Sequence, residues 1–128
     1  MSDGYTTALR VLMMPKDTNH EGSIFGGVIL SHIDQAGYVE ARKHGINRWV
    51  TAAIDRVDFV APVFKGDIVS YLTKTVRLGT TSVRVDVRVE AERNLDGECV
   101  HVTTAQLVMV SIDDDCRPTP FADSGAQR

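Results

Sequence analysis

One long stretch of helical periodicity stands alone in this sequence. From Ile24 to His44 there is no proline, and apolar or very small residues recur at spacings of three and four. Ser23 is expected to cap the start of this helix, and Gly45 is expected to end it. A lone amphipathic helix must bury its apolar stripe against another element, so the remaining residues have to supply a sheet.

Strand-like segments supply that sheet. The clearest is at residues 83–91, where valine and alanine alternate with arginine, aspartate and glutamate. Four further strands are expected at residues 6–13, 49–61, 68–78 and 99–112. The alternation slips near Asp55 and Arg56, which predicts a bulge or bend there. The sequence therefore predicts an α+β domain in which an antiparallel sheet wraps one helix. Because one helix covers only one sheet face, a homo-oligomer is expected.

Composition restricts the kind of protein. The 128 residues suit one domain (1–128), with flexible ends expected at about residues 1–5 and 114–128. The net charge of −3 does not suggest binding to nucleic acid, which usually requires a basic surface. No apolar segment approaches the length needed to span a membrane. Cys99 and Cys116 lack the spacing of a metal site, and no signal peptide opens the chain. These features predict a cytoplasmic protein with free thiols.

Asp34 is the residue of the helical stripe that most needs an explanation. It lies four residues after Leu30 and three before Gly37, so its neighbours on the stripe are apolar or very small. A carboxylate on such a face costs stability unless it is paired, hydrogen-bonded or used in chemistry. From the helix alone two interpretations stay open: a catalytic carboxylate, or a border residue that turns to solvent or pairs with a basic neighbour.

Asn19, Gly26 and Gly27 surround the expected helix start. Backbone N–H groups there are free donors at the positive end of the helix dipole, and glycine lets a carbonyl oxygen come close to them. This is the outline of an oxyanion hole, beside which Asp34 can act as a general base on water or as a nucleophile while Asn19 orients the reactants. The alternative is structural, with Asn19 as a loop cap and the glycines as packing residues.

A second polar group is centred on a turn between two expected strands. It consists of Arg77, Gly79, Thr80, Thr81, Ser82 and Arg84. Hydroxyls, backbone N–H groups and guanidinium groups around one turn can hold phosphate oxygens. The alternative is a polar turn flanked by solvated arginines. No serine-hydrolase elbow, nucleotide-binding glycine pattern or metal-ligand spacing accompanies these groups, so neither a metal nor a separate cofactor is expected.

Three segments together resemble the hotdog-fold acyl-CoA thioesterases of the YciA and brain acyl-CoA hydrolase type. Residues 15–34 are similar to the pattern P-x-D-T-N-x-x-G-x-I-F-G-G-x-I-(L/M)-S-x-(I/M)-D. Residues 59–67 match F-x-x-P-V-x-x-G-D, and residues 79–83 match G-T-T-S-V. The resemblance covers about residues 6–120, and the combination is much more specific than any one segment.

The resemblance implies a hotdog fold, in which a five-stranded antiparallel sheet wraps a long helix. It implies hydrolysis of acyl-CoA, with coenzyme A as part of the substrate, by a homo-oligomer whose minimal unit is a dimer and whose expected assembly is a hexamer, a trimer of dimers. By position, Asn19 and Asp34 match the family's active-site asparagine and aspartate, contributed by two different subunits. Residues 26–27 match the place of the thioester carbonyl, and residues 79–82 match a segment near the CoA.

Another function on the same fold is a non-catalytic sensor or carrier of acyl-CoA. The presence of both Asn19 and Asp34, and the lack of an appended DNA-binding segment, argue against it. A hydratase would need a histidine and acid pair, but His32 and Asp34 are two residues apart in a helix and point to different faces. The acyl chain length, and the role of Asp34 as base or nucleophile, stay open.

Overall fold

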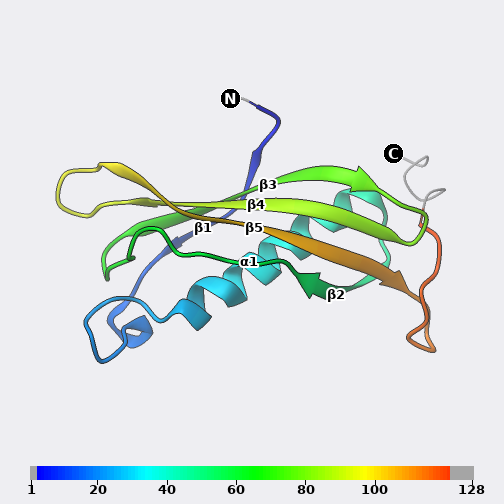
Figure 1. The fold of residues 1–128 in the computed structure, drawn as a ribbon, viewed down its shortest axis with the longest axis horizontal. Coiled ribbons are helices and arrows are strands. Elements are labelled where there is room, and N and C mark those ends of the chain that lie inside the picture. Colours follow the sequence, from blue (N-terminus) through cyan, green and yellow to red (C-terminus); the bar gives the residue numbers. More distant parts are fainter. Residues whose placement is uncertain (1–2, 122–128) are drawn as a thin grey trace.

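The computed structural model describes residues 3–121, which form one long helix packed against a curled antiparallel sheet (Figure 1). The elements, in chain order, are β1 (Thr6–Leu12), η1 (Pro15–Asp17), α1 (Gly26–Ala41), η2 (Arg42–His44), β2 (Arg48–Ile54), β3 (Ile68–Leu78), β4 (Ser82–Glu92) and β5 (Cys99–Ile112). The five strands lie in the order β1-β3-β4-β5-β2, and every neighbouring pair is antiparallel. This arrangement confirms the predicted α+β class and the hotdog fold.

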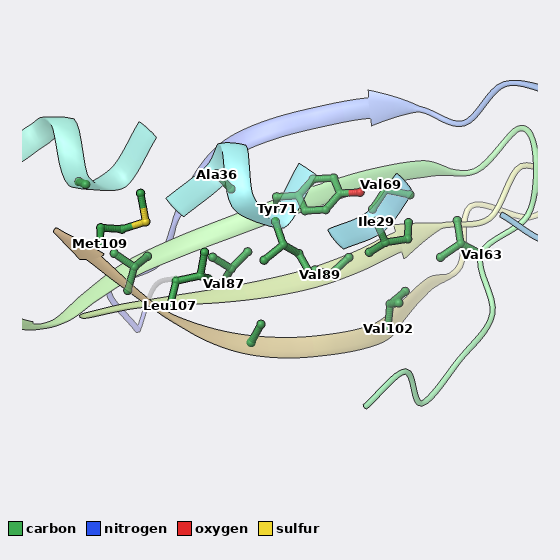
Figure 2. Close-up of a cluster of buried hydrophobic side chains, with 14 of the residues drawn as sticks. Ile29, Ala36, Val63, Val69, Tyr71, Val87, Val89, Val102, Leu107 and Met109 are labelled. Carbon is green, nitrogen blue, oxygen red and sulfur yellow. The ribbon is translucent and has the colours of Figure 1, made fainter. Parts of the chain in front are cut away.

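The core lies between α1 and the inner face of the sheet. The alternating apolar residues of β4, from Val83 to Ala91, are completely buried, as the sequence predicts. Figure 2 shows Ile29 of α1 near Val69 and Val89 in this layer. Period-two alternation puts every second β4 side chain on the helix, and the charged residues between them lie on the outer face.

Gly37 lets α1 approach β5 more closely than any other residue type would. A Cβ built on Gly37 would lie 2.9 Å from Leu107 Cδ2, which is inside van der Waals contact. The helix backbone therefore rests directly on the β5 side chains at this turn.

Glu40 is a buried carboxylate that belongs to the framework. Its oxygens accept hydrogen bonds from Thr73 (2.9 Å) and Thr75 (2.7 Å), and Lys43 Nζ lies 2.8 Å away. Burial acts to raise the pKa of Glu40, but the bonds from Lys43, Thr75 and Thr73 outweigh it and hold the pKa below its usual range. The ionised Glu40 therefore links the last turn of α1 to β3, and both of its carboxylate oxygens have hydrogen-bond partners.

The structure corrects several local predictions about the helix. The residue before α1 is Phe25, and Ser23 does not cap the helix because its N–H and hydroxyl bond the side chain of Asn19. Gly45 ends the helical segment as predicted, but it does so after the short helix η2 and with an extended backbone. Asp34 is exposed at the edge of the buried stripe, which includes the predicted Ile33 and Gly37 together with Ile29 and Ala36.

The second strand is shorter than predicted. Its register shifts between Thr51 and Ala53, not near residues 55–56, and the strand ends at Ile54. The chain then runs beside β5 without regular pairing, held by bonds from Asp55 N to Gln106 O (2.8 Å) and from Val60 N to Val102 O (2.9 Å). The bulge after Thr51 adds one residue to β2 and changes which face the following side chains point to, so the alternation of the sequence does not continue as one regular strand.

The chain ends contact the body of the fold where they are described. Residues 1–2 and 122–128, which belong to the predicted flexible ends, lie outside the described part. Tyr5 donates a hydrogen bond to Asp86 (3.2 Å), and Phe121 is buried. Within residues 3–121, no helix combines the length and apolar character that crossing a bilayer requires.

Candidate active site

Asp34 lies near the middle of α1 and is turned toward β2. Its side chain is exposed to solvent in the single chain, and its Oδ1 accepts a hydrogen bond from the hydroxyl of Thr51. Thr51 sits on the inner side of β2, on the same parity as the buried Trp49. The carboxylate is therefore held in one direction by a strand neighbour while its other oxygen stays open.

A groove of about 630 Å³ opens beside this carboxylate. It is lined by Leu9, Asp34, Gln35, Tyr38, Val39, Trp49, Val50, Thr51 and Met109. Most of these side chains are apolar, and Asp34 is the charged one. An apolar groove with one directed carboxylate suits a ligand that has a hydrocarbon part and a polar reacting group.

Asn19 organises the loop before α1 and takes no part in lining this groove. Its Oδ1 accepts bonds from Glu21 N (2.9 Å) and Ser23 N (3.1 Å), and its Nδ2 donates to Ser23 Oγ (3.1 Å). Among residues 3–121, the second hydrogen of that amide has no acceptor, and no hydrogen bond joins Asn19 to Asp34. One subunit alone does not bring the two predicted residues together.

Gly26 and Gly27 open α1 with unused donors. The N–H groups of Val28 and Ile29 both point to Phe25 O, whereas the N–H groups of the two glycines meet no acceptor in the described part of the chain. A Cβ built on Gly27 would meet nothing within 4 Å, and one on Gly26 would make ordinary contact with Phe59 at 3.5 Å. Neither glycine has a left-handed φ. Contacts within the described part of the chain therefore do not require glycine at either position, and both N–H groups are accessible to a ligand.

A bulge in β3 places the two predicted arginines on one face. The β3–β4 register shifts between Thr75 and Arg77, so that Thr75 faces the helix and Arg77 pairs with Arg84 on the outer face. Arg84 donates to Gln106 (2.7 Å) and lies 3.3 Å from Asp55, and both arginines keep solvent contact. Arg77 and Arg84 are therefore cross-strand neighbours on the outer face at this end of the sheet, where Asp55 partly balances the charge of Arg84.

The turn between β3 and β4 is tied back through its carbonyl groups. Gly79 N donates to Ser82 O (2.8 Å), Thr81 O accepts from Ser111 N (2.9 Å), and Thr80 O accepts from Phe121 N (3.4 Å). The N–H and hydroxyl groups of Thr80 and Thr81 donate no hydrogen bond within residues 3–121. Figure 1 shows this turn at the end of the sheet where α1 ends, and the loop before α1 at the other end.

The predicted site residues therefore form three separate groups in one subunit: the Asp34 groove, the helix start with Asn19, and the β3–β4 turn. The sequence analysis did not identify Thr51. Because Thr51 is two residues after the buried Trp49, strand alternation places both side chains on the inner face, and a polar side chain there could have been noticed. Among the described residues, no cluster of histidine, cysteine or carboxylate side chains is arranged to hold a metal ion.

Comparison with known proteins gives consistent matches. The model of the thioesterase superfamily matches residues 21–109. The acyl-CoA thioester hydrolase YciA of Salmonella typhimurium is 34% identical over 120 residues, covering 91% of this chain and 90% of that protein. A hexameric hotdog-fold thioesterase of Campylobacter jejuni superposes with a TM-score of 0.86 at 42% identity, over 94% of this chain and 93% of that one. An acyl-CoA hydrolase of Staphylococcus aureus, solved with butyryl coenzyme A, superposes with a TM-score of 0.79 at 29% identity, over 93% and 80% of the two chains.

Proposed function

The chain belongs to the thioesterase superfamily, and from that premise we propose that it hydrolyses acyl-CoA thioesters to a free carboxylic acid and CoA. The observation that carries the proposal is Asp34, a carboxylate held by the Thr51 hydroxyl at the mouth of an apolar groove. The names of the relatives support the substrate class, since they are acyl-CoA thioester hydrolases.

The proposed site is shared between two subunits. Asp34 is seven or eight residues beyond the glycine pair, which corresponds to roughly 11 Å along the axis of one helix. A thioester carbonyl cannot touch the free N–H groups of a helix start and a carboxylate that far along the same helix. The helix start and Asn19 of the partner subunit, brought over the Asp34 groove, meet this requirement, and two-fold symmetry then creates two equal sites.

Exposed apolar surface supports this assembly. Phe25 (50% exposed), Phe59 (44%) and Val60 (68%) surround the helix start, and Val39 (40%) and Val50 (42%) border the Asp34 groove. β2 is an edge strand with one side unpaired. Solvent-exposed edges and apolar patches of this kind are covered in stable proteins. We therefore propose a homo-oligomer built from dimers, with a hexamer as the assembly, as in the Campylobacter jejuni relative.

The chemistry follows from these positions. The free N–H groups of Gly26 and Gly27 bind the thioester oxygen and stabilise the negative charge that develops on it. Asp34 either takes a proton from water, whose oxygen attacks the carbonyl carbon, or attacks that carbon directly to give an anhydride that water then opens. In both routes the carbon–sulfur bond breaks, and CoA leaves as a thiolate that takes up a proton. Asn19 orients the attacking water or the carbonyl, and no cofactor beyond the CoA of the substrate takes part.

The test is CoA release from a panel of short, medium, long and aromatic acyl-CoAs. The wild-type protein is expected to turn over at least one class, and Asp34→Asn is expected to lose about 10²–10⁴-fold, the usual value of a general base. Asp114→Asn, which changes an exposed carboxylate remote from the groove, is the matched control. Near-wild-type turnover by folded Asp34→Asn would overturn the assignment, and binding without release by the wild type would identify a carrier or sensor.

A further inference from the structure

The C-terminal segment at residues 117–121 folds back and closes the end of the sheet. After β5 the chain turns at residues 113–116, and Pro118 pairs with Ile112. Thr119 N then donates to Ser111 O (2.8 Å), and Phe121 N donates to Thr80 O (3.4 Å). This segment, which we call the C-terminal strap, therefore bonds both the end of β5 and the β3–β4 turn.

Phe121 anchors the strap. Its side chain is 3% exposed and inserts at the end of the core, with its ring 5.0 Å from the Trp49 ring in an edge-to-face arrangement and 6.4 Å from the ring of His44. Trp49 is fixed independently, because its indole N–H donates to Gly45 O (3.1 Å). Loss of the Phe121 ring would therefore loosen the strap more than it would move Trp49.

The strap determines which groups of the turn are free. The carbonyl of Thr80 accepts from the strap, and that of Thr81 accepts from Ser111, which the strap also bonds. With both carbonyls tied back, the N–H and hydroxyl groups of Thr80 and Thr81 stay unused within residues 3–121, and Arg77 and Arg84 flank the turn on the outer face. Donors fixed in this way suit an anion, because ordering them costs nothing further when the ligand binds.

We propose that Phe121 is a positioning residue that holds the β3–β4 turn in shape for the phosphate-bearing nucleotide part of acyl-CoA. The inference rests on the proposed function, because it assigns the nucleotide end of the substrate to this turn. Phe121 itself touches neither the substrate nor the reacting atoms. Its effect is on binding, and that effect is confined to substrates that carry the nucleotide.

The test compares an acyl-CoA with the acyl-pantetheine thioester of the same acyl group, which lacks the nucleotide. For Phe121→Ala, KM for the acyl-CoA is expected to rise roughly tenfold, the effect of losing about one hydrogen bond to a charged group. Its kcat, and both constants for the acyl-pantetheine, are expected to stay near wild type. Phe121→Leu, which keeps a large apolar side chain, is expected to restore most of the affinity.

Val102→Ala is the control for general destabilisation, since Val102 is fully buried at the other end of β5. It should lower the melting temperature without changing the ratio of the two KM values. Equal losses on both thioesters for Phe121→Ala, or no loss on either, would overturn the proposal. If the wild type cleaves neither thioester, the proposed function fails, and calorimetric titration with CoA decides this inference separately. Unchanged CoA affinity in Phe121→Ala would then refute it, and weakened affinity would support it.

Discussion

Subunit complementation is the sharpest test of the shared site. Asn19→Ala and Asp34→Asn each remove one of the two side chains that the proposed site needs. If these side chains come from different subunits, each variant alone builds only defective sites and is nearly inactive. A mixed dimer differs, because one of its two sites receives both substitutions and the other receives neither. Activity therefore returns when two inactive proteins are unfolded together and refolded.

The size of the recovery follows from the geometry. Random pairing of equal amounts makes about half of the dimers mixed, and one site in each mixed dimer is intact, so about a quarter of all sites should be active. The same fraction holds in a hexamer if each site spans only one dimer. The alternative, a site within one subunit, predicts no recovery. It would require the Asn19 loop to fold back along its own helix, whereas the structure commits that side chain to Ser23 and Glu21.

The assay is the initial rate of CoA release from each parent and from the mixture at equal total protein. Native mass spectrometry of differently tagged parents counts the mixed dimers. A mixture of the two parents that are not unfolded controls for slow subunit exchange. If mixed dimers are abundant and the mixture stays as inactive as its parents, Asn19 and Asp34 act within one subunit and the shared site is refuted.

Three further changes test other parts of the structure. Replacing Arg77 and Arg84 together by alanine should raise KM for acyl-CoA more than it lowers kcat, because a phosphate contact is the same in ground and transition states. Arg10→Ala, which removes an arginine from an exposed ion pair, is the control. An unchanged kcat/KM in the double variant would count against the site. Gly37→Ala should destabilise the fold by about 1–3 kcal/mol in thermal or urea unfolding, because the new Cβ would lie 2.9 Å from Leu107 Cδ2 of β5. An unfolding midpoint equal to that of the wild type would contradict this close packing. The lowered pKa of Glu40 means that its ionised form stabilises the fold above the unfolded pKa of about 4.3, and this contribution is lost as the pH falls through the folded-state value. The stability advantage of wild type over Glu40→Gln should therefore be present at pH 7 and shrink on acidification, and a pH-independent difference would refute this role.

The spacing of apolar residues in the sequence correctly predicted the strands in which one face is buried and the other is polar. The strict alternation at residues 83–91 corresponds to β4, and the ranges expected for the third and fifth strands match β3 and β5. Periodicity failed where a local irregularity changed the parity. The register shift near Thr51 changed where β2 ends. The buried face of α1 includes the predicted Ile33 but is centred closer to Ile29 and Ala36, which leaves Asp34 outside it.

The sequence offered a set of candidate site residues, and it contained no information on how the fold arranges them. Residue type left both a catalytic and a structural interpretation open for Asp34 and the glycine pair, and the resemblance to the thioesterase family favoured the catalytic one. The contact of Thr51 with Asp34 depends on which strand lies against α1. The conformation of the β3–β4 turn at Thr80 depends on the C-terminal strap, which begins many residues later in the chain. Such contacts are set by tertiary pairing, which no local pattern contains.

The order of the strands has a consequence for how the chain folds. β3, β4 and β5 are consecutive in sequence and adjacent in the sheet, so they can pair as local hairpins. Both edges instead join distant segments, Thr6 with Thr73 and Arg48 with Ile112. Distant pairings carry a larger loop-closure entropy and form more slowly than local ones. The central meander is therefore expected to fold first and β2 to dock late. Since β2 carries Thr51 and one wall of the Asp34 groove, a chain with most of its core in place would still lack the proposed active site.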